Sequence, residues 1–193
     1  MRNRKPIAFG EKAAQDQQGF SLLEVLISMV VLAVGLVALL GVFGVAIAAT
    51  QTSQEDMIAK ELASQAMESV FTSRDSSQLV WAQVNNVSNA GIFADGFQSI
   101  NNAGPDGIFG TADDAGAGPL LLKEPGPDGI SGTSDDISLP LTNYQRSISI
   151  QPIVVGGTTV ATLRTITVTI QYYTPQFKAP KTFVLTSQIS QFR

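Results

Sequence analysis

The longest apolar stretch of the chain covers residues 25–49. Its twenty-five residues carry no charge, and Ser28 is the only polar side chain among them. A helix needs about 20 consecutive apolar residues to cross the hydrocarbon core of a bilayer. No proline interrupts the stretch, so every backbone N–H within it can join a helical hydrogen bond. The pattern therefore predicts a membrane-spanning helix.

A second pattern follows directly in residues 50–71, where apolar side chains recur at spacings of three and four. This spacing is typical of an amphipathic helix that packs on a domain. Because no proline or glycine lies between Val45 and Arg74, the two patterns together predict one continuous helix from about Phe20 to Arg74. The packing face consists of two adjoining rows, Ile58, Leu62, Ala66 and Val70, and Ala59, Ala63, Met67 and Phe71.

The end of the chain has the period of strands. Apolar positions alternate with Ser, Thr and Gln in residues 144–151 and 165–172, and Gly156 and Gly157 between them are typical of a hairpin turn. A turn with prolines near residues 174–180 leads to a third predicted strand with Phe183, Leu185 and Ile189. Three antiparallel strands with one apolar face need a cover, and the helical stripe supplies it. The predicted fold class is α+β, a long N-terminal helix packed on a small C-terminal antiparallel sheet.

Between helix and sheet, residues 75–142 lose all periodicity and are rich in Asn, Ser, Gly, Asp and Pro, which predicts a long loop insertion. Residues 79–84 are compatible with either a short strand or a helical turn. The insertion contains an internal repeat, G-P-D-G-I-F-G-T-A-D-D at 104–114 and G-P-D-G-I-S-G-T-S-D-D at 126–136. Nine of the eleven positions are identical.

Charge is distributed unevenly along the chain, whose formal net charge is −4. The first 18 residues hold four basic and two acidic side chains, and the remainder is acidic. The positive-inside rule therefore predicts a cytoplasmic N-terminus and a C-terminal domain outside the cytoplasm. An acidic outer domain gives no electrostatic footprint for nucleic acid.

The chain contains neither cysteine nor histidine. No disulfide can form, and the usual general base near neutral pH is missing. Together with the membrane helix, this composition favours a protein that is not an enzyme.

The junction between the basic leader and the apolar stretch reads Gly19-Phe20-Ser21-Leu22-Leu23-Glu24-Val25. It resembles the N-terminal signature of type IV pilins and type II secretion pseudopilins. The resemblance implies that a prepilin peptidase cleaves after Gly19 and that Phe20 becomes the N-methylated terminus. It also implies a subunit that sits in the inner membrane and then joins other pilin or pseudopilin subunits in a filament through its first helix.

The run from Leu22 to Leu36 looks most like the minor pilins that prime or modify type IV pili. A minor pseudopilin of type II secretion is the alternative, and a non-polymerising, membrane-anchored, calcium-dependent binding domain is an alternative of another class. An ordinary secretory signal is suggested by Ala46-Ile47-Ala48, but the apolar run exceeds the roughly 7–15 residues of such signals. An unprocessed anchor is a further alternative.

These interpretations divide the chain into five segments. They are a cleaved leader at 1–19, a transmembrane and assembly half-helix at 20–49, an amphipathic half-helix at 50–75, a loop region at 76–142 and a sheet at 143–193.

Glu24 is the one charge near the start of the apolar stretch. A carboxylate within a membrane costs about 2.5–3.5 kcal/mol on insertion scales, so such residues are usually functional. In the family that the signature resembles, this glutamate pairs with the N-terminal amine of a neighbouring subunit and sets the register of assembly. The alternative is that Glu24 merely lies near the positive end of the helix dipole, where an anion is tolerated.

The two repeats place carboxylates beside glycines at bends, which suits a hard cation such as Ca²⁺ with its six to eight oxygen ligands. The alternative is a pair of solvated turns, because Asp and Gly are common turn residues. The predicted calcium ligands are Asp106, Asp113 and Asp114 in one repeat and Asp128, Asp135 and Asp136 in the other.

Overall fold

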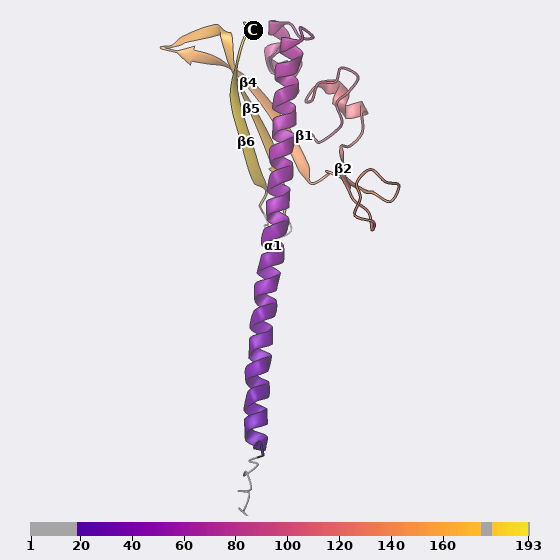
Figure 1. Ribbon diagram of the computed structural model, residues 1–193. Helices are drawn as coiled ribbons and strands as arrows, with labels where there is room; N and C mark the ends of the chain where they lie inside the picture. The colour runs from indigo at the N-terminus through magenta and orange to yellow at the C-terminus, as the bar shows by residue number, and fades with distance from the viewer. Residues whose placement is uncertain (1–18, 175–178, 193) are drawn as a thin grey trace, which may run out of the picture. The chain divides into compact units, whose positions relative to one another are not determined.

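The computed structural model describes residues 19–174 and 179–192. The chain divides into two compact units, Met1–Ile47 and Ala48–Arg193, and we call the second unit the head. Helix α1 (Leu22–Asp75) begins in the first unit and ends in the head (Figure 1). The predicted leader, apart from Gly19, and residues 175–178 of the predicted turn lie outside the described residues.

The part of α1 that belongs to the head presents the predicted stripe to the core. Ala59, Ala63 and Ala66 have no exposed surface and belong to the core that the helix shares with the sheet. Both predicted rows contribute to this face. Its buried members are Ala59, Leu62, Ala63, Ala66, Met67, Val70 and Ser73, with Ile58 and Phe71 half-buried at the edges.

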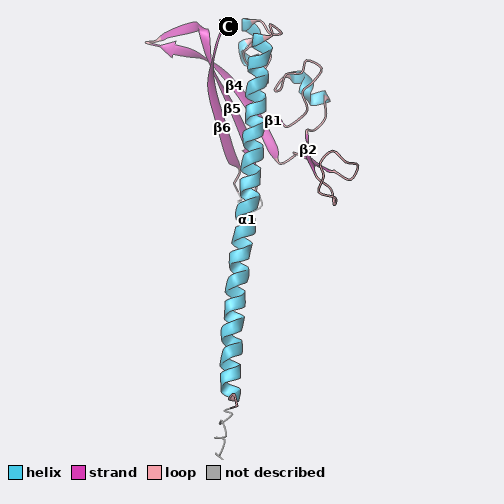
Figure 2. Cartoon of the chain, viewed as in Figure 1, coloured by secondary structure: helices cyan, strands magenta, loops and turns pink. Residues whose placement is uncertain are grey.

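The helix packs on a four-stranded antiparallel sheet, which confirms the predicted α+β fold (Figure 2). The strands, in the order β1-β4-β5-β6, are β1 (Gln98–Ser99), β4 (Tyr144–Val155), β5 (Thr158–Tyr172) and β6 (Lys181–Ser190). Three of them correspond to the predicted strands, whereas β1 was not predicted. Its two residues are too few to show a period. The buried inner face includes Tyr144, Arg146, Ile148, Ile150, Ile166, Val168, Ile170, Tyr172 and Ile189.

The turn between β4 and β5 consists of Gly156 and Gly157, as predicted. Their φ angles are 57° and 81°, the left-handed region that a two-residue type I′ hairpin turn requires at both positions. The pairing changes register between Pro152 and Ile153. The end of this hairpin is therefore offset from the rest of the sheet.

The insertion is more ordered than the predicted loop. It contains 3-10 turns at η1 (Trp81–Gln83), η2 (Val87–Asn89) and η3 (Ala112–Gly116), and a separate two-stranded sheet of β2 (Leu121–Glu124) and β3 (Ile137–Pro140). The stretch at 79–84, for which the sequence allowed a strand or a helical turn, contains the short helical turn η1. Side chains at irregular spacing anchor the insertion, so no periodic pattern marks them. Its buried apolar residues are Leu79, Val84, Phe93, Ile100, Ile108 and Leu141.

Polar contacts at both ends of α1's head portion join it to the sheet. Near its start, Asp56 accepts hydrogen bonds from the Tyr172 hydroxyl at 2.5 Å and from Lys181 at 2.6 Å. Near its end, Arg74 donates to the carbonyl oxygens of Ser190 at 3.1 Å and Phe192 at 3.0 Å. These contacts join the helix to the sheet without a disulfide, since the chain has no cysteine.

Candidate functional site

The Gly19–Phe20 junction lies immediately before the first turn of α1. Ser21 caps the helix, because its Oγ accepts a hydrogen bond from the Leu23 N–H at 3.3 Å and its carbonyl oxygen accepts one from Val25 at 3.2 Å. Phe20 is 83% exposed, and no heavy atom lies within 4 Å of the position that a side chain at Gly19 would take. Among the described residues, both Gly19 and Phe20 are therefore exposed at the bond that a peptidase would cut.

Glu24 lies in the first turn of α1 and is exposed. With Ser21 it forms an S-x-x-E sequence, the pattern of a capping box, and a carboxylate at this position interacts favourably with the helix dipole. Its exposure leaves the carboxylate available to a partner. Nothing in the single chain assigns it a role in assembly.

The helix that follows Glu24 is apolar around its whole circumference. By length and composition α1 is suited to cross a membrane, and none of its most apolar window is buried within the chain. A soluble helix buries one stripe and exposes polar residues on the other side, as the head portion of α1 does. The N-terminal half instead needs lipid or other apolar helices around it.

Residues 15–40 match the family model of the prokaryotic N-terminal methylation motif. The chain therefore carries the type IV pilin-like or pseudopilin-like signature that its sequence resembles. A motif of this kind implies a structural subunit whose precursor is processed by a peptidase and which assembles with other pilin-type subunits. Searches among curated proteins and among solved structures gave no match, so the head is described from its own geometry alone.

The first repeat, residues 104–114, forms a closed turn that we call loop 1. Asp106 accepts a hydrogen bond from the Ile108 N–H at 2.8 Å, and Asp114 accepts one from the Gly110 N–H at 2.6 Å. The Thr111 hydroxyl donates to Asp113 at 2.5 Å. Each carboxylate thus stabilises the backbone or a hydroxyl of its own loop.

The second repeat, residues 126–136, forms loop 2 at the tip of the β2–β3 hairpin. The same bonds recur at matching positions: Ile130 N–H to Asp128 at 2.8 Å, Gly132 N–H to Asp136 at 2.7 Å, and the Thr133 hydroxyl to Asp135 at 2.6 Å. Gly110 and Gly132 both adopt a φ of 90°, which a residue with a side chain rarely reaches. The repeated sequence therefore encodes a repeated conformation.

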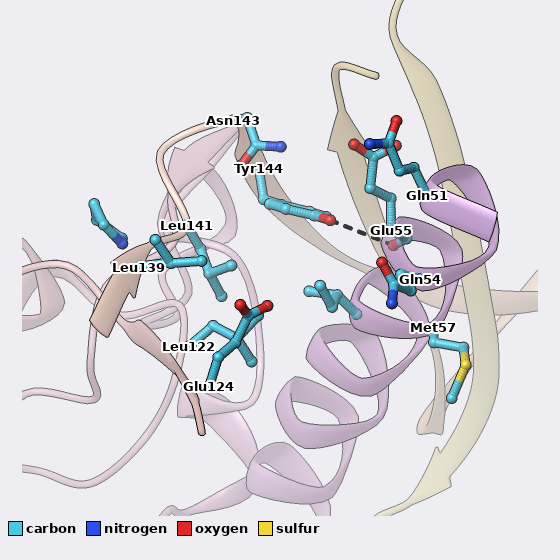
Figure 3. Close-up of a pocket in the computed structure, with 12 residues that line it drawn as sticks. Gln51, Gln54, Glu55, Met57, Leu122, Glu124, Leu139, Leu141, Asn143 and Tyr144 are labelled. Carbon is cyan, nitrogen blue, oxygen red and sulfur yellow. Dashed lines mark hydrogen bonds between the residues drawn. The ribbon is translucent and has the colours of Figure 1, made fainter. Parts of the chain in front are cut away.

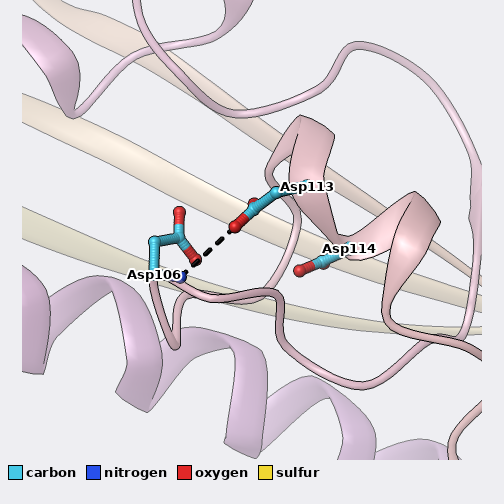
Figure 4. Close-up of side chains that lie close together, drawn as sticks. All are labelled: Asp106, Asp113 and Asp114. Atoms are coloured by element: carbon cyan, nitrogen blue, oxygen red, sulfur yellow. Dashed lines mark hydrogen bonds between the residues drawn. The ribbon is translucent and has the colours of Figure 1, made fainter.

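Loop 1 brings its three predicted ligands together (Figure 4). One carboxylate oxygen from each of Asp106, Asp113 and Asp114 lies within 4.8 Å of the other two. Among the described residues, this is the one group of three or more His, Cys, Asp or Glu side chains whose ligand atoms lie close enough together to hold a metal ion. Asp128, Asp135 and Asp136 share the hydrogen bonds of loop 2 but do not meet that spacing.

Loop 1 also contacts a residue whose role the sequence did not predict. Arg146 on β4 is 2% exposed, its Nη2 lies 3.4 Å from Asp114 Oδ2, and its guanidinium stacks over the Phe109 ring at 5.0 Å. The sequence feature that could have identified Arg146 is its charge at an inward-facing position, where the neighbouring inward residues of the strand are apolar. Because a buried cation needs an anion beside it, the carboxylates of the repeats were candidate partners for Arg146.

The pKa values of the two adjacent aspartates of loop 1 are shifted in opposite directions. Burial raises the pKa of Asp114, against the lowering effects of the Gly110 and Gly104 N–H groups and of Arg146. The Thr111 hydroxyl lowers the pKa of Asp113, and in loop 2 the Thr133 hydroxyl lowers the pKa of Asp135 in the same way. The matching shift follows from the matching hydrogen bond.

Proposed function

We propose that the chain is a minor pilin, a structural subunit that primes or modifies a type IV pilus. The observation that carries the proposal is the methylation motif at residues 15–40, placed before a helix whose apolar half is exposed all round. That half needs apolar neighbours, and the equivalent helices of other subunits supply them. The head then supplies the surface of the subunit.

The basic leader supports a precursor with its N-terminus in the cytoplasm and its head in the periplasm. Prepilin peptidase removes residues 1–19 and methylates Phe20, after which the subunit leaves the inner membrane for the filament. Glu24 then pairs with the terminal amine of a neighbour, which is favourable where water is excluded.

A minor pseudopilin of type II secretion is the alternative, since the motif is common to both systems. A membrane-anchored calcium-binding domain that never polymerises is the alternative of another class. Only the first two functions require processing after Gly19.

Intact-mass analysis of the protein from its native host tests the proposal. The expected chain begins at N-methylated Phe20, and a chain beginning at Thr50 would establish ordinary signal cleavage instead. Glu24→Ala should be processed normally but lost from sheared filaments, with Ser28→Ala as the matched control. Normal incorporation of Glu24→Ala would exclude the register role.

As a second function we propose that the head binds Ca²⁺ through its acidic loops. The clustered carboxylate oxygens of Asp106, Asp113 and Asp114 favour it, because each carboxylate has lone pairs beyond the hydrogen bonds that it accepts. Asp128, Asp135 and Asp136 would form the second, looser site. Identical melting curves of the head in calcium and in chelator would overturn the proposal.

A further inference from the structure

An apolar groove lies at the end of the head where α1 enters it, between α1 and the hairpin of β2 and β3 (Figure 3). Its volume is about 610 Å³. Leu122, Leu139 and Leu141 form one wall, and α1 with Gln54 and Met57 faces them. We call this cavity the base groove.

The hairpin that forms this wall has little cover of its own. A two-stranded sheet is marginally stable in water unless its apolar side chains pack against something else. Leu121, Ile137 and Leu139 of the hairpin are 46%, 51% and 42% exposed. The wall of the base groove therefore offers apolar surface to a further partner.

Two glutamates give the base groove a negative charge. Glu55 on α1 and Glu124 on β2 line it, and none of its described lining residues is basic. Oε2 of Glu55 is buried but has no hydrogen-bond partner among the described residues. Burial raises the pKa of Glu55, while Lys181 acts in the opposite direction. A buried carboxylate oxygen without a donor is costly, so the groove suits a ligand that brings N–H donors and a positive charge.

The base groove begins where α1 leaves its apolar stretch. That stretch ends at Ala49, and Gln51 and Gln54 already belong to the groove lining. The headgroup layer of a bilayer is about 5–7 Å thick on each side, which corresponds to about four residues of helix. In an anchored chain the groove therefore opens at the headgroup layer of the bilayer that α1 spans.

We propose that the base groove binds a phospholipid with a primary-ammonium headgroup, the chemistry of phosphatidylethanolamine, from the leaflet on the head's side of the membrane. The ammonium group donates hydrogen bonds to Glu55 and Glu124, and the leucine wall contacts the methylene groups below the headgroup. This inference rests on the membrane anchor of the proposed function but does not require assembly into a pilus.

Charge and hydrogen bonding separate this lipid from others. An anionic headgroup is repelled by the two carboxylates of the groove. The trimethylated nitrogen of phosphatidylcholine is positive but has no N–H to donate to Glu55 Oε2. A lysine of another protein offers the same ammonium group, but bilayer lipid adjoins the groove of every anchored chain at a high effective concentration.

Native mass spectrometry of the full-length chain from nanodiscs tests the proposal. The discs contain phosphatidylcholine mixed with either phosphatidylethanolamine or phosphatidylglycerol. Phosphatidylethanolamine should be retained about tenfold over phosphatidylcholine, which is the preference that one charge-assisted hydrogen bond provides, and phosphatidylglycerol should not be enriched.

Matched glutamate variants assign the preference to the groove. Glu55→Gln combined with Glu124→Gln should abolish it, whereas Glu61→Gln, at an exposed position of α1 outside the groove lining, should keep it. Equal retention of phosphatidylethanolamine and phosphatidylcholine by the unmodified chain would overturn the inference and favour a protein partner. A preference that survives the double substitution would overturn it as well.

Carbodiimide coupling locates the headgroup, because it joins a primary amine to an adjacent carboxylate as an amide. In the phosphatidylethanolamine discs the lipid-bearing peptide should contain Glu55 or Glu124. Asp128 is the control, since it is exposed on the same hairpin and lies outside the groove lining. Equal coupling to Asp128 would show contact without a site and would refute the inference. The discs contain no filament, so this failure leaves the pilin function intact, whereas absence of the unmodified protein from sheared filaments refutes that function alone.

Discussion

Loop 1 lies against the core of the head, whereas loop 2 lies at the tip of the β2–β3 hairpin. Matching hydrogen bonds link a carboxylate to a glycine N–H and another carboxylate to a threonine hydroxyl in both loops. Asp114 of loop 1 accepts a further hydrogen bond from the Gly104 N–H at 3.0 Å. Their surroundings differ sharply: Ile108 is 1% exposed and Ile130 is 60% exposed. A Cβ atom at Gly110 would lie 2.5 Å from the Ile148 side chain, whereas a Cβ atom at Gly132 would meet nothing within 4 Å beyond its chain neighbours.

The comparison separates what a local sequence determines from what the fold determines. The turn conformation belongs to the repeat itself, since it forms with or without a core beside it. The energetic weight of each residue depends on its neighbours: Asp114 has Arg146 beside it, whereas Asp136 has no such cation among the described residues. Matched substitutions in the two loops should therefore differ in cost although the loops share one geometry.

Replacing the last aspartate of each loop should give the largest difference. Asp114→Ala leaves Arg146 buried without its anion and should lower the free energy of unfolding by about 3–5 kcal/mol. Asp136→Ala removes the hydrogen bonds from the Gly132 N–H and the Thr133 hydroxyl at a half-exposed position and should cost about 0.5–1.5 kcal/mol. Urea denaturation of the fragment 50–193 measures both, and equal costs would show that Arg146 does not depend on loop 1.

The isoleucines should give the next largest difference. Ile108→Ala removes a fully buried side chain and should cost about 2–5 kcal/mol. Ile130→Ala changes an exposed side chain and should stay within about 0.5 kcal/mol. The same denaturation measurement applies. A large cost for Ile130→Ala would mean that the hairpin tip is covered in solution.

Calcium should sharpen the comparison through Asp113 and Asp135, which make equivalent bonds to Thr111 and Thr133. At 100 times its dissociation constant, one bound ion stabilises the head by about 2.7 kcal/mol. Asp113→Asn should remove most of the calcium-dependent rise in melting temperature, because loop 1 unfolds together with the core. Asp135→Asn should remove little, because loop 2 can open locally. The opposite order would place the important site in the hairpin.

The smallest expected effect is that pH changes the stability contributed by Asp114 and by Asp135 in opposite directions. The raised pKa of Asp114 contributes stability that is present below its unfolded pKa of about 3.9 and is lost as pH rises through its folded pKa. The lowered pKa of Asp135 contributes stability that is present above about 3.9 and is lost as pH falls through its folded value. Unfolding free energies of wild type, Asp114→Asn and Asp135→Asn between about pH 2.5 and pH 6 should therefore differ from wild type with opposite slopes. Parallel slopes would contradict the assigned shifts.

Periodic elements were predictable from the sequence because their side chains repeat every two, or every three to four, residues. The stripe on α1, the alternation of β4 and β5, and the Gly156–Gly157 turn follow directly from such repeats. The methylation signature was likewise predictable, since it is a contiguous motif.

The ordered insertion and the contacts of loop 1 were not predictable in the same way. Phe93 and Ile100 are buried by side chains distant in sequence, and no local period places them in the core. The repeats themselves differ mainly by Phe109 in place of Ser131, which gives little sign that one is buried. The pairing of Arg146 with Asp114 depends on how loop 1 lies against β4 in space, and the spacing of residues in the sequence does not determine that.

The alignment of α1 with the strands has a mechanical consequence for a filament subunit. Tension along the anchoring helix enters the head through the backbone of α1 and passes to the sheet through the side chains between Ala59 and Val70. Because β4 starts beside Glu55 and Arg74 holds the end of β6, the strands of the head run along the portion of α1 that belongs to the head. The load is therefore applied in shear, and all these contacts must slide together before the head yields, without any covalent cross-link.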